Sequence, residues 1–157
     1  MEDQKSPKWR ASVTRYAPLF LWVGVIFFLS SPEGSFNQTS RIIGPLLHFF
    51  FPDILPETEA TIHAVVRKTA HFTEYAILAF FAVRAFSTSA SVFIRQRSYI
   101  FTLVLVIMIA SLDEFNQSFE PSRTSSFWDV LLDISGGLVM IAALVLFRKN
   151  RLPTSNG

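Results

Sequence analysis

Four apolar stretches, separated by polar segments, dominate the pattern along this chain of 157 residues. They cover residues 16–31, 69–86, 98–112 and 127–147. A helix that crosses a bilayer needs about 20 apolar residues, each adding about 1.5 Å of rise. The first and third stretches are shorter, and they reach this length only with flanking polar residues such as Arg15 and Asp113. The pattern predicts an all-α membrane protein, a bundle of four transmembrane helices.

The first stretch has a second interpretation, as a cleaved signal peptide. Basic residues precede it, and Ser30 and Ser31 at its end are small enough for a cleavage zone. Leu29, however, is too large for the position three residues before a cut after Ser31. We therefore expect the stretch to be retained as a span.

The segment between the first two stretches, residues 32–66, has a pattern of its own. Apolar residues recur there at helical spacing in a run that is interrupted by Pro45 and Pro52 and is too short to span. These residues are Ile42, Ile43, Leu46, Leu47 and Phe50. The run predicts an interfacial helix or a segment covering the mouth of the bundle, and both stay open. Pro56, followed by acidic residues, predicts the start of a long helix that continues to Phe86.

The distribution of Lys and Arg predicts the orientation, because basic loops stay on the cytoplasmic side. Ten basic residues fall on one side of the four spans: Lys5, Lys8, Arg10, Arg15, Arg84, Arg95, Arg97, Arg148, Lys149 and Arg151. Four fall on the other: Arg41, Arg67, Lys68 and Arg123. Both termini are therefore expected in the cytoplasm. Residues 1–15 and 148–157 would be cytoplasmic segments around a transmembrane domain of residues 16–147.

The amino-acid composition excludes several classes of function for this protein. The chain has no Cys, which excludes disulfides, iron–sulfur clusters and thiol catalysis. Its net charge of +2 is small, and its basic residues do not gather in one patch. We therefore expect no nucleic-acid partner.

Two polar groups lie where the apolar stretches begin or end. The first comprises Arg67, Lys68, His71, Glu74 and Tyr75, and the second Asp113, Glu114, Gln117, Pro121, Arg123, Asp129 and Asp133. Residues three or four apart share a helix face, so Gln117 shares a face with Asp113 and with Glu114, and Asp129 shares one with Asp133. Ionisable groups are costly in hydrocarbon, so such a cluster is a candidate functional site. Gly136 and Gly137, one turn deeper, would let another helix approach closely.

Three interpretations of the cluster compete. A metal site could use His71 with Asp113, Glu114 or Asp129, but there is no paired-histidine spacing, so we expect no metal. A phosphate-recognising site would use Arg67, Lys68 and Arg123, with His71 as an acid, base or nucleophile. The third is an interhelical ion-pair plug with no chemistry, which fixes the geometry of the bundle.

The spacing of these residues resembles the VanZ-like membrane protein family. The family pattern is a basic residue before H-x-x-x-Y, then D-E-x-x-Q, P-x-R and D-x-x-x-N with glycines opening the last span. Its counterparts here are Lys68, His71, Tyr75, Asp113, Glu114, Gln117, Pro121, Arg123 and Asp129. Asp133 departs from the pattern, because the family usually has Asn there. The resemblance implies a small bacterial membrane protein linked to the cell envelope, but it implies no settled activity.

These observations lead to one principal hypothesis and one alternative. The principal hypothesis is a pocket at the outer face that recognises an anionic envelope lipid or headgroup, in the bacterial plasma membrane. The expected site residues are Lys68, His71, Tyr75, Asp113, Glu114, Gln117, Arg123, Asp129 and Asp133. The alternative is an accessory subunit of a larger membrane complex, with the cluster as interhelical glue. Membrane lipids and other membrane subunits are the expected partners, no cofactor is expected, and catalysis stays an open question.

Overall fold

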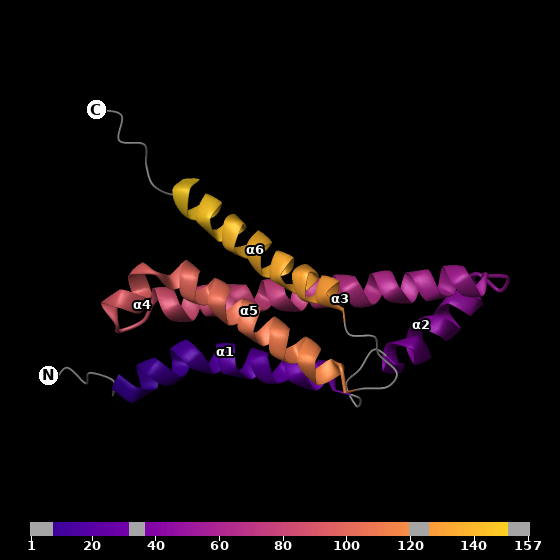
Figure 1. The fold of residues 1–157 in the computed structure, drawn as a ribbon, viewed down its shortest axis with the longest axis horizontal. Helices are drawn as coiled ribbons and strands as arrows, with labels where there is room; N and C mark the ends of the chain where they lie inside the picture. The colour runs from indigo at the N-terminus through magenta and orange to yellow at the C-terminus, as the bar shows by residue number, and fades with distance from the viewer. Residues whose placement is uncertain (1–7, 32–36, 120–125, 151–157) are drawn as a thin grey trace, which may run out of the picture.

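The described part of the protein is all-helical, and Figure 1 shows how its helices are arranged. The structure, a computed structural model, describes residues 8–31, 37–119 and 126–150. The helices are α1 (Lys8–Ser30), α2 (Asn37–Phe50), α3 (Pro56–Ser87), α4 (Val92–Gln96), α5 (Ser98–Gln117) and α6 (Phe127–Asn150). The prediction of an all-α fold is therefore confirmed for these residues.

The long helix α3 is the axis of the molecule. It contacts each of the other described helices, and it extends past α1, α5 and α6 at the end where α2 folds back along it (Figure 1). It begins at Pro56, in the first helical position, with Glu57 and Glu59 in the first turn. The missing N–H of Pro and the positive end of the helix dipole favour such a start. The predicted beginning of α3 and its unbroken course past Phe86 are confirmed.

Among the described residues, three helices are long and apolar enough to cross a membrane: Trp9–Ser30, Ser98–Gln117 and Phe127–Asn150. They contain the first, third and fourth predicted spans. Helix α3 is long enough but does not qualify, because its apolar half carries His71, Glu74 and Arg84. The protein is thus a membrane protein with three helices suited to crossing, and the role of α3 as a fourth is taken up below.

The buried core joins α1, α3 and α5, and α6 packs across α3 through its glycines. A Cβ added to Gly136 would lie 2.2 Å from the carbonyl oxygen of Phe72 in α3, and one on Gly137 would lie 2.8 Å from Val106 in α5. Only glycine therefore allows α6 to approach both helices this closely. The predicted close approach at the two glycines is confirmed.

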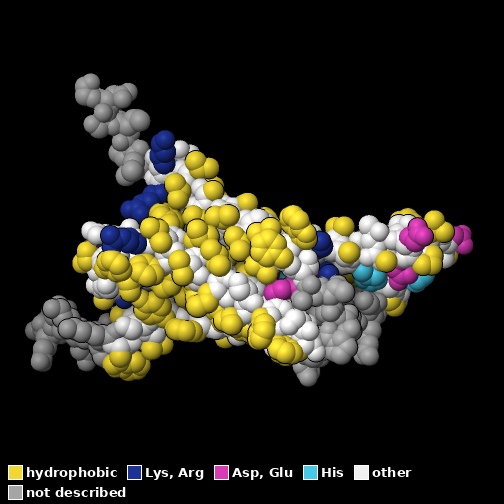
Figure 2. Space-filling view, viewed as in Figure 1, with side chains coloured by type: hydrophobic (Ala, Val, Ile, Leu, Met, Phe, Trp, Pro, Cys, Tyr) yellow, Lys and Arg dark blue, Asp and Glu magenta, His cyan; other side chains and the backbone are white. Residues whose placement is uncertain are grey.

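The two ends of the molecule differ in charge and surface chemistry. Figure 2 shows basic side chains at the end near both termini, and acidic and histidine side chains at the opposite tip. That tip is the hairpin of α2 and the start of α3, and several large apolar side chains are exposed on it: Leu46, Phe49, Phe50, Phe51 and Leu55. The predicted helical spacing in this segment is confirmed, and α2 runs through Pro45.

Candidate functional site

The two polar groups come together where α3, α5 and α6 meet. Helix α3 supplies Lys68, His71 and Tyr75, α5 supplies Asp113, Glu114 and Gln117, and α6 supplies Asp129 and Asp133. Pro121 and Arg123 lie outside the described residues. We predicted that His71, Glu114 and Arg123 converge with Asp129 alongside; His71, Glu114 and Asp129 do line one cavity, and the place of Arg123 stays a prediction. Their role in binding a ligand stays a prediction.

One half of the cluster is a hydrogen-bond network around Asp113, which is fully buried. Its Oδ2 accepts hydrogen bonds from Ser30 Oγ at 2.9 Å, Gln117 Nε2 at 3.0 Å and the Tyr75 hydroxyl at 3.3 Å. These donors belong to α1, α5 and α3, so one carboxylate connects three helices. We call these four residues the Asp113 network.

The other half is a small cavity next to this network, which we call the Asp133 cavity. Its lining comprises Arg67, Lys68, His71, Glu114, Gln117, Asp129, Leu132 and Asp133. The space open to the centre of a water-sized sphere is about 10 Å³, close to the minimum for one water molecule. A single water or ion fits inside, and anything larger must lie at the mouth.

Asp133 is almost completely buried, at 2% exposure. His71 Nδ1 lies 3.6 Å from its Oδ1, which is beyond hydrogen-bond distance. This Oδ1 is buried and accepts no hydrogen bond within the described ranges 8–31, 37–119 and 126–150. Buried charges usually pair or coordinate a metal, so Asp133 faces the cavity with unused acceptor capacity.

Two contacts at the rim of the cavity connect α6 to the neighbouring helices. Lys68 Nζ lies 3.7 Å from Asp129 Oδ1, and the Lys68 side chain is 53% exposed. Glu114 Oε1 accepts a hydrogen bond from the backbone N–H of Ser126, immediately before α6. A carboxylate at a helix N-terminus is favoured by the exposed N–H groups and the dipole there. The rim therefore holds α6 to both α3 and α5.

A potential metal-binding group spans the two halves. His71, Asp113 and Asp133 each offer one ligand atom, and these atoms all lie within 4.8 Å of one another. Asp133 and Asp113 were placed on different predicted spans, so only the packing of α5 and α6 reveals that they meet. This geometry gives weight to the metal interpretation that the sequence disfavoured.

Several residues of the cluster were not among the predicted site residues. Ser30 of α1 lies in the Asp113 network, although the sequence suggested only a cleavage zone there. Its place at the end of an apolar stretch that meets the other polar groups was the available signal. Arg67 lines the cavity. Glu74 is buried with its backbone carbonyl accepting from Trp22 Nε1 at 2.9 Å.

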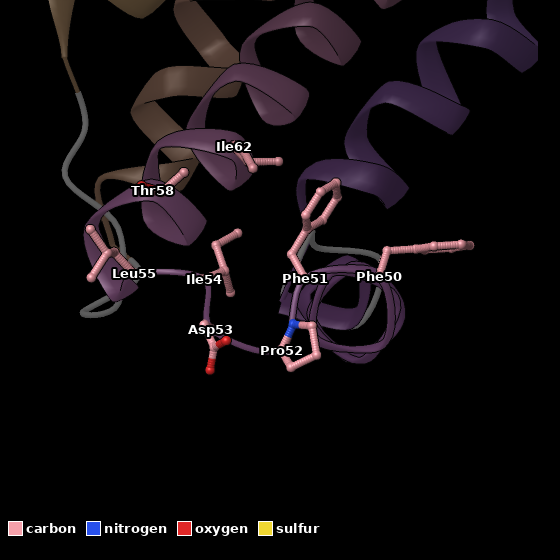
Figure 3. A pocket seen from close by; sticks show the side chains of 8 residues that line it. All are labelled: Phe50, Phe51, Pro52, Asp53, Ile54, Leu55, Thr58 and Ile62. Atoms are coloured by element: carbon pink, nitrogen blue, oxygen red, sulfur yellow. The ribbon is translucent and has the colours of Figure 1, made fainter.

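A second pocket lies away from the cluster, at the hairpin of α2 and α3. Its volume is about 560 Å³. Its lining is mainly apolar and comprises residues 50–55 together with Thr58 and Ile62. Figure 3 shows Phe51, Ile54 and Ile62 on the sides of the gap between the two helices. Its chemistry suits an apolar group and differs from that of the Asp133 cavity.

Comparison with known proteins agrees with the polar pattern. No curated protein and no solved structure matches the chain. The sequence model of the VanZ/LLP1 family matches residues 16–148, which include every residue of the polar cluster. The chain therefore belongs to the VanZ/LLP1 family.

Proposed function

We propose that this protein is a four-span protein of the bacterial plasma membrane that binds an anionic envelope-lipid headgroup at the mouth of the Asp133 cavity. The observation that carries the proposal is the position of Arg67 and Lys68. They lie side by side on α3, line the mouth of the cavity, and precede the apolar half of the helix. Basic side chains at this level meet the phosphates of a lipid layer.

The length of α3 supports a fourth span. Its 32 residues extend about 48 Å, whereas the hydrocarbon layer is about 30 Å thick. The last 20 residues or so therefore suffice to cross, and they begin at Lys68. This half of α3 lies along α1 and α5 (Figure 1), which supports a common depth. The remaining part, from Pro56 to Arg67, would project from the membrane with α2.

The charge distribution supports cytoplasmic termini. Basic side chains gather at the end near both termini (Figure 2), as the positive-inside rule expects. Because the chain has no Cys, single substitutions Thr58→Cys and Gln96→Cys test this with an impermeant thiol reagent on intact cells. We expect labelling at position 58 and none at 96. Labelling at 96 alone would contradict the orientation.

The exposure and the weak ion pair of Lys68 support binding of an anion at the mouth of the Asp133 cavity. Its contact with Asp129 is long, at 3.7 Å, and its side chain is half exposed, so exchange for a phosphate oxygen costs little. The cavity itself is too small for a headgroup, which restricts the anion to the mouth. The anion there would replace water on Arg67 and Lys68 with charge-assisted hydrogen bonds.

Analysis of copurified lipid tests the proposal. Lys68→Gln removes the charge at the mouth, and Lys149→Gln is the matched control, since Lys149 lies in the last turn of α6. We expect the ratio of anionic to zwitterionic lipid to fall for Lys68→Gln and to equal wild type for the control. Equal ratios in all three proteins would reject headgroup recognition.

One observation favours the accessory-subunit hypothesis as a second candidate. Phe49, Phe50 and Phe51 are exposed at 78%, 64% and 62% on the hairpin tip, beyond the ends of α1, α5 and α6 (Figure 1). Clustered exposed aromatic side chains mark protein or membrane contacts. A photo-crosslinking residue at position 49 separates the two: adducts with another membrane protein support an accessory role, and adducts with lipid alone support an interfacial hairpin.

A further inference from the structure

The potential metal-binding group between the Asp113 network and the Asp133 cavity has a donor set that suits a cation. It combines the imidazole of His71 with the carboxylates of Asp113 and Asp133, and no two of the ligand atoms are more than 4.8 Å apart. Two buried carboxylates this close repel each other unless a cation lies between them or one is protonated. The His71 imidazole beside them adds a nitrogen ligand, which a structural hydrogen-bond network does not require.

Asp133 supplies the second, independent observation. It is 98% buried, since its exposure is 2%, and it belongs to the cavity lining. Its Oδ1 accepts no hydrogen bond from the part of the chain that the structure describes, and His71 Nδ1 lies 3.6 Å away. That separation is too long for a hydrogen bond but close to the spacing of two ligands on one ion.

The geometry can be compared with metal coordination. Ligand atoms about 2.1 Å from a tetrahedral ion are roughly 3.4 Å apart, which is close to the 3.6 Å between His71 and Asp133. The widest separation between ligand atoms is at most 4.8 Å. It shortens to the coordination spacing if each of the two ligand atoms moves inward by less than about 1 Å. The cavity has room for about one water-sized particle, so an ion with a water ligand fits there.

The donor types select the class of metal. Imidazole favours Zn²⁺ and other transition metals, whereas Ca²⁺ and Mg²⁺ prefer oxygen ligands only. We propose that His71, Asp113 and Asp133 bind one divalent transition-metal ion of the Zn²⁺ or Mn²⁺ type where the Asp113 network meets the Asp133 cavity. Three protein ligands leave a coordination position open toward the cavity, as in zinc sites that bind water or substrate.

Metal content of the purified full-length protein tests the inference. The protein is stripped with a chelator in detergent, titrated with Zn²⁺ or Mn²⁺ by calorimetry, and analysed for bound metal by mass spectrometry. We expect about one Zn²⁺ per chain, weaker binding of Mn²⁺ in the same site, and little binding of Mg²⁺. We expect His71→Gln and Asp133→Asn each to weaken Zn²⁺ binding by about 100-fold or more, since even outer-shell changes cost 10- to 100-fold.

The chain offers a matched control for histidine. His48 and His63 lie 3.2 Å and 3.6 Å from the Glu59 carboxylate at the hairpin, where adventitious Zn²⁺ could bind. The double variant His48→Gln/His63→Gln should keep the wild-type equivalent of metal. Loss of metal in this variant, with retention in His71→Gln and Asp133→Asn, would overturn the inference, as would a wild-type protein that binds none.

Thermal unfolding of each variant shows whether a loss of metal binding reflects a lost ligand or a misfolded protein. Asp113 is left unchanged, because its network holds α1, α3 and α5 together, whereas Asp133→Asn preserves shape. Wild type and the control should gain thermal stability on addition of Zn²⁺, because a ligand that binds the folded state stabilises it. Asp133→Asn should fold but gain none. An equal gain in all proteins would contradict the site.

This inference does not rest on headgroup recognition. Zn²⁺ binding is measured without lipid and depends on His71 and Asp133, whereas the lipid ratio depends on Lys68. If the protein binds no Zn²⁺ but the lipid ratio falls in Lys68→Gln, the metal site is rejected and the proposed function stands. If Zn²⁺ binds but the lipid ratio is unchanged, the metal site stands and headgroup recognition is rejected.

Discussion

Two buried aspartates, each with one carboxylate oxygen within 4.8 Å of the other's, differ in the hydrogen bonds that they accept. Asp113 accepts hydrogen bonds at one oxygen from Ser30, Tyr75 and Gln117. Asp133 has its Oδ1 beside His71 at 3.6 Å with no hydrogen bond accepted there from the described residues. Both lie below 3% exposure. A carboxylate whose Oδ2 accepts hydrogen bonds from three helices stabilises their packing, whereas one that lines a cavity is suited to binding.

Under our proposals, this difference gives the two halves of the polar cluster separate roles. The interhelical-glue hypothesis describes the Asp113 network, which links α1, α3 and α5. The binding hypothesis describes the Asp133 cavity, which α6 completes. The two hypotheses therefore apply to neighbouring regions, and variants can change one region while the other is monitored.

The largest expected effect comes from breaking the Asp113 network. Asp113→Ala leaves the donors of Ser30, Tyr75 and Gln117 without their shared acceptor in a buried position. We expect a loss of about 3 kcal/mol in the free energy of unfolding, from several hydrogen bonds to one charged group. Thermal or denaturant unfolding in detergent measures it. Asp53→Ala, at an exposed position, is the control, and similar losses in both would argue against a structural network.

The second effect separates α6 from α3 while leaving the Asp113 network in place. Gly136→Ala puts a methyl group against the backbone of Phe72, which cannot move aside as a side chain does. We expect a loss of roughly 1–3 kcal/mol, the usual cost of overpacking, and a longer separation of His71 from Asp133. Unfolding and a crosslink between α3 and α6 measure the two changes.

Gly24→Ala is the matched control for this substitution. Nothing lies within 4 Å of a Cβ built on Gly24 in α1, and Ala favours helix over Gly. Unchanged or slightly raised stability is expected. Equal destabilisation by the two glycine variants would show that close approach at Gly136 is unimportant.

A smaller effect tests the contribution of α1 to the network. Ser30→Ala removes one donor to Asp113 and leaves Tyr75 and Gln117 in place. Hydrogen bonds between membrane helices average about 0.6 kcal/mol, with a maximum near 1.7. We expect a loss of about 1 kcal/mol, measured by unfolding. Ser31→Ala is the neighbouring comparison, because Ser31 Oγ, just past the end of α1, donates a hydrogen bond to the carbonyl of Phe28. A larger loss for Ser31→Ala would contradict this assignment.

The sequence predicted the helices better than the roles of their polar residues. Hydropathy located the apolar half of every long helix, and Pro56 located the start of α3. Hydropathy did not predict that α1 begins at Lys8. A helix can extend beyond its apolar stretch where the neighbouring polar residues do not disfavour helical structure. Polar spacing predicted that Asp113 and Gln117 share a helix face, and the structure joins them by a hydrogen bond of 3.0 Å.

The distinction between the two aspartates was not available from the sequence. Asp113 and Asp133 are the same residue type near the ends of apolar stretches, and each has a polar residue four positions away. Their surroundings are set by helix packing: Ser30 reaches Asp113 across 83 positions, and Gly136 determines how near α6 brings Asp133 to His71. Long-range packing of this kind leaves no local pattern that a single sequence can reveal.

The smallest expected effect is also the sharpest test of the comparison, because its sign differs between the two sites. Asn has the shape of Asp without its charge. In metal-free protein, Asp133→Asn removes a buried charge that lacks a hydrogen bond at Oδ1, so we expect stability to rise by up to about 1 kcal/mol. Asp113→Asn replaces a charged acceptor of three hydrogen bonds with a weaker neutral one, so we expect a loss. Unfolding of both variants after chelation measures the difference. Losses of similar size at both positions would mean that Asp133 is held by donors as Asp113 is, and the division of the cluster into glue and binding site would be wrong.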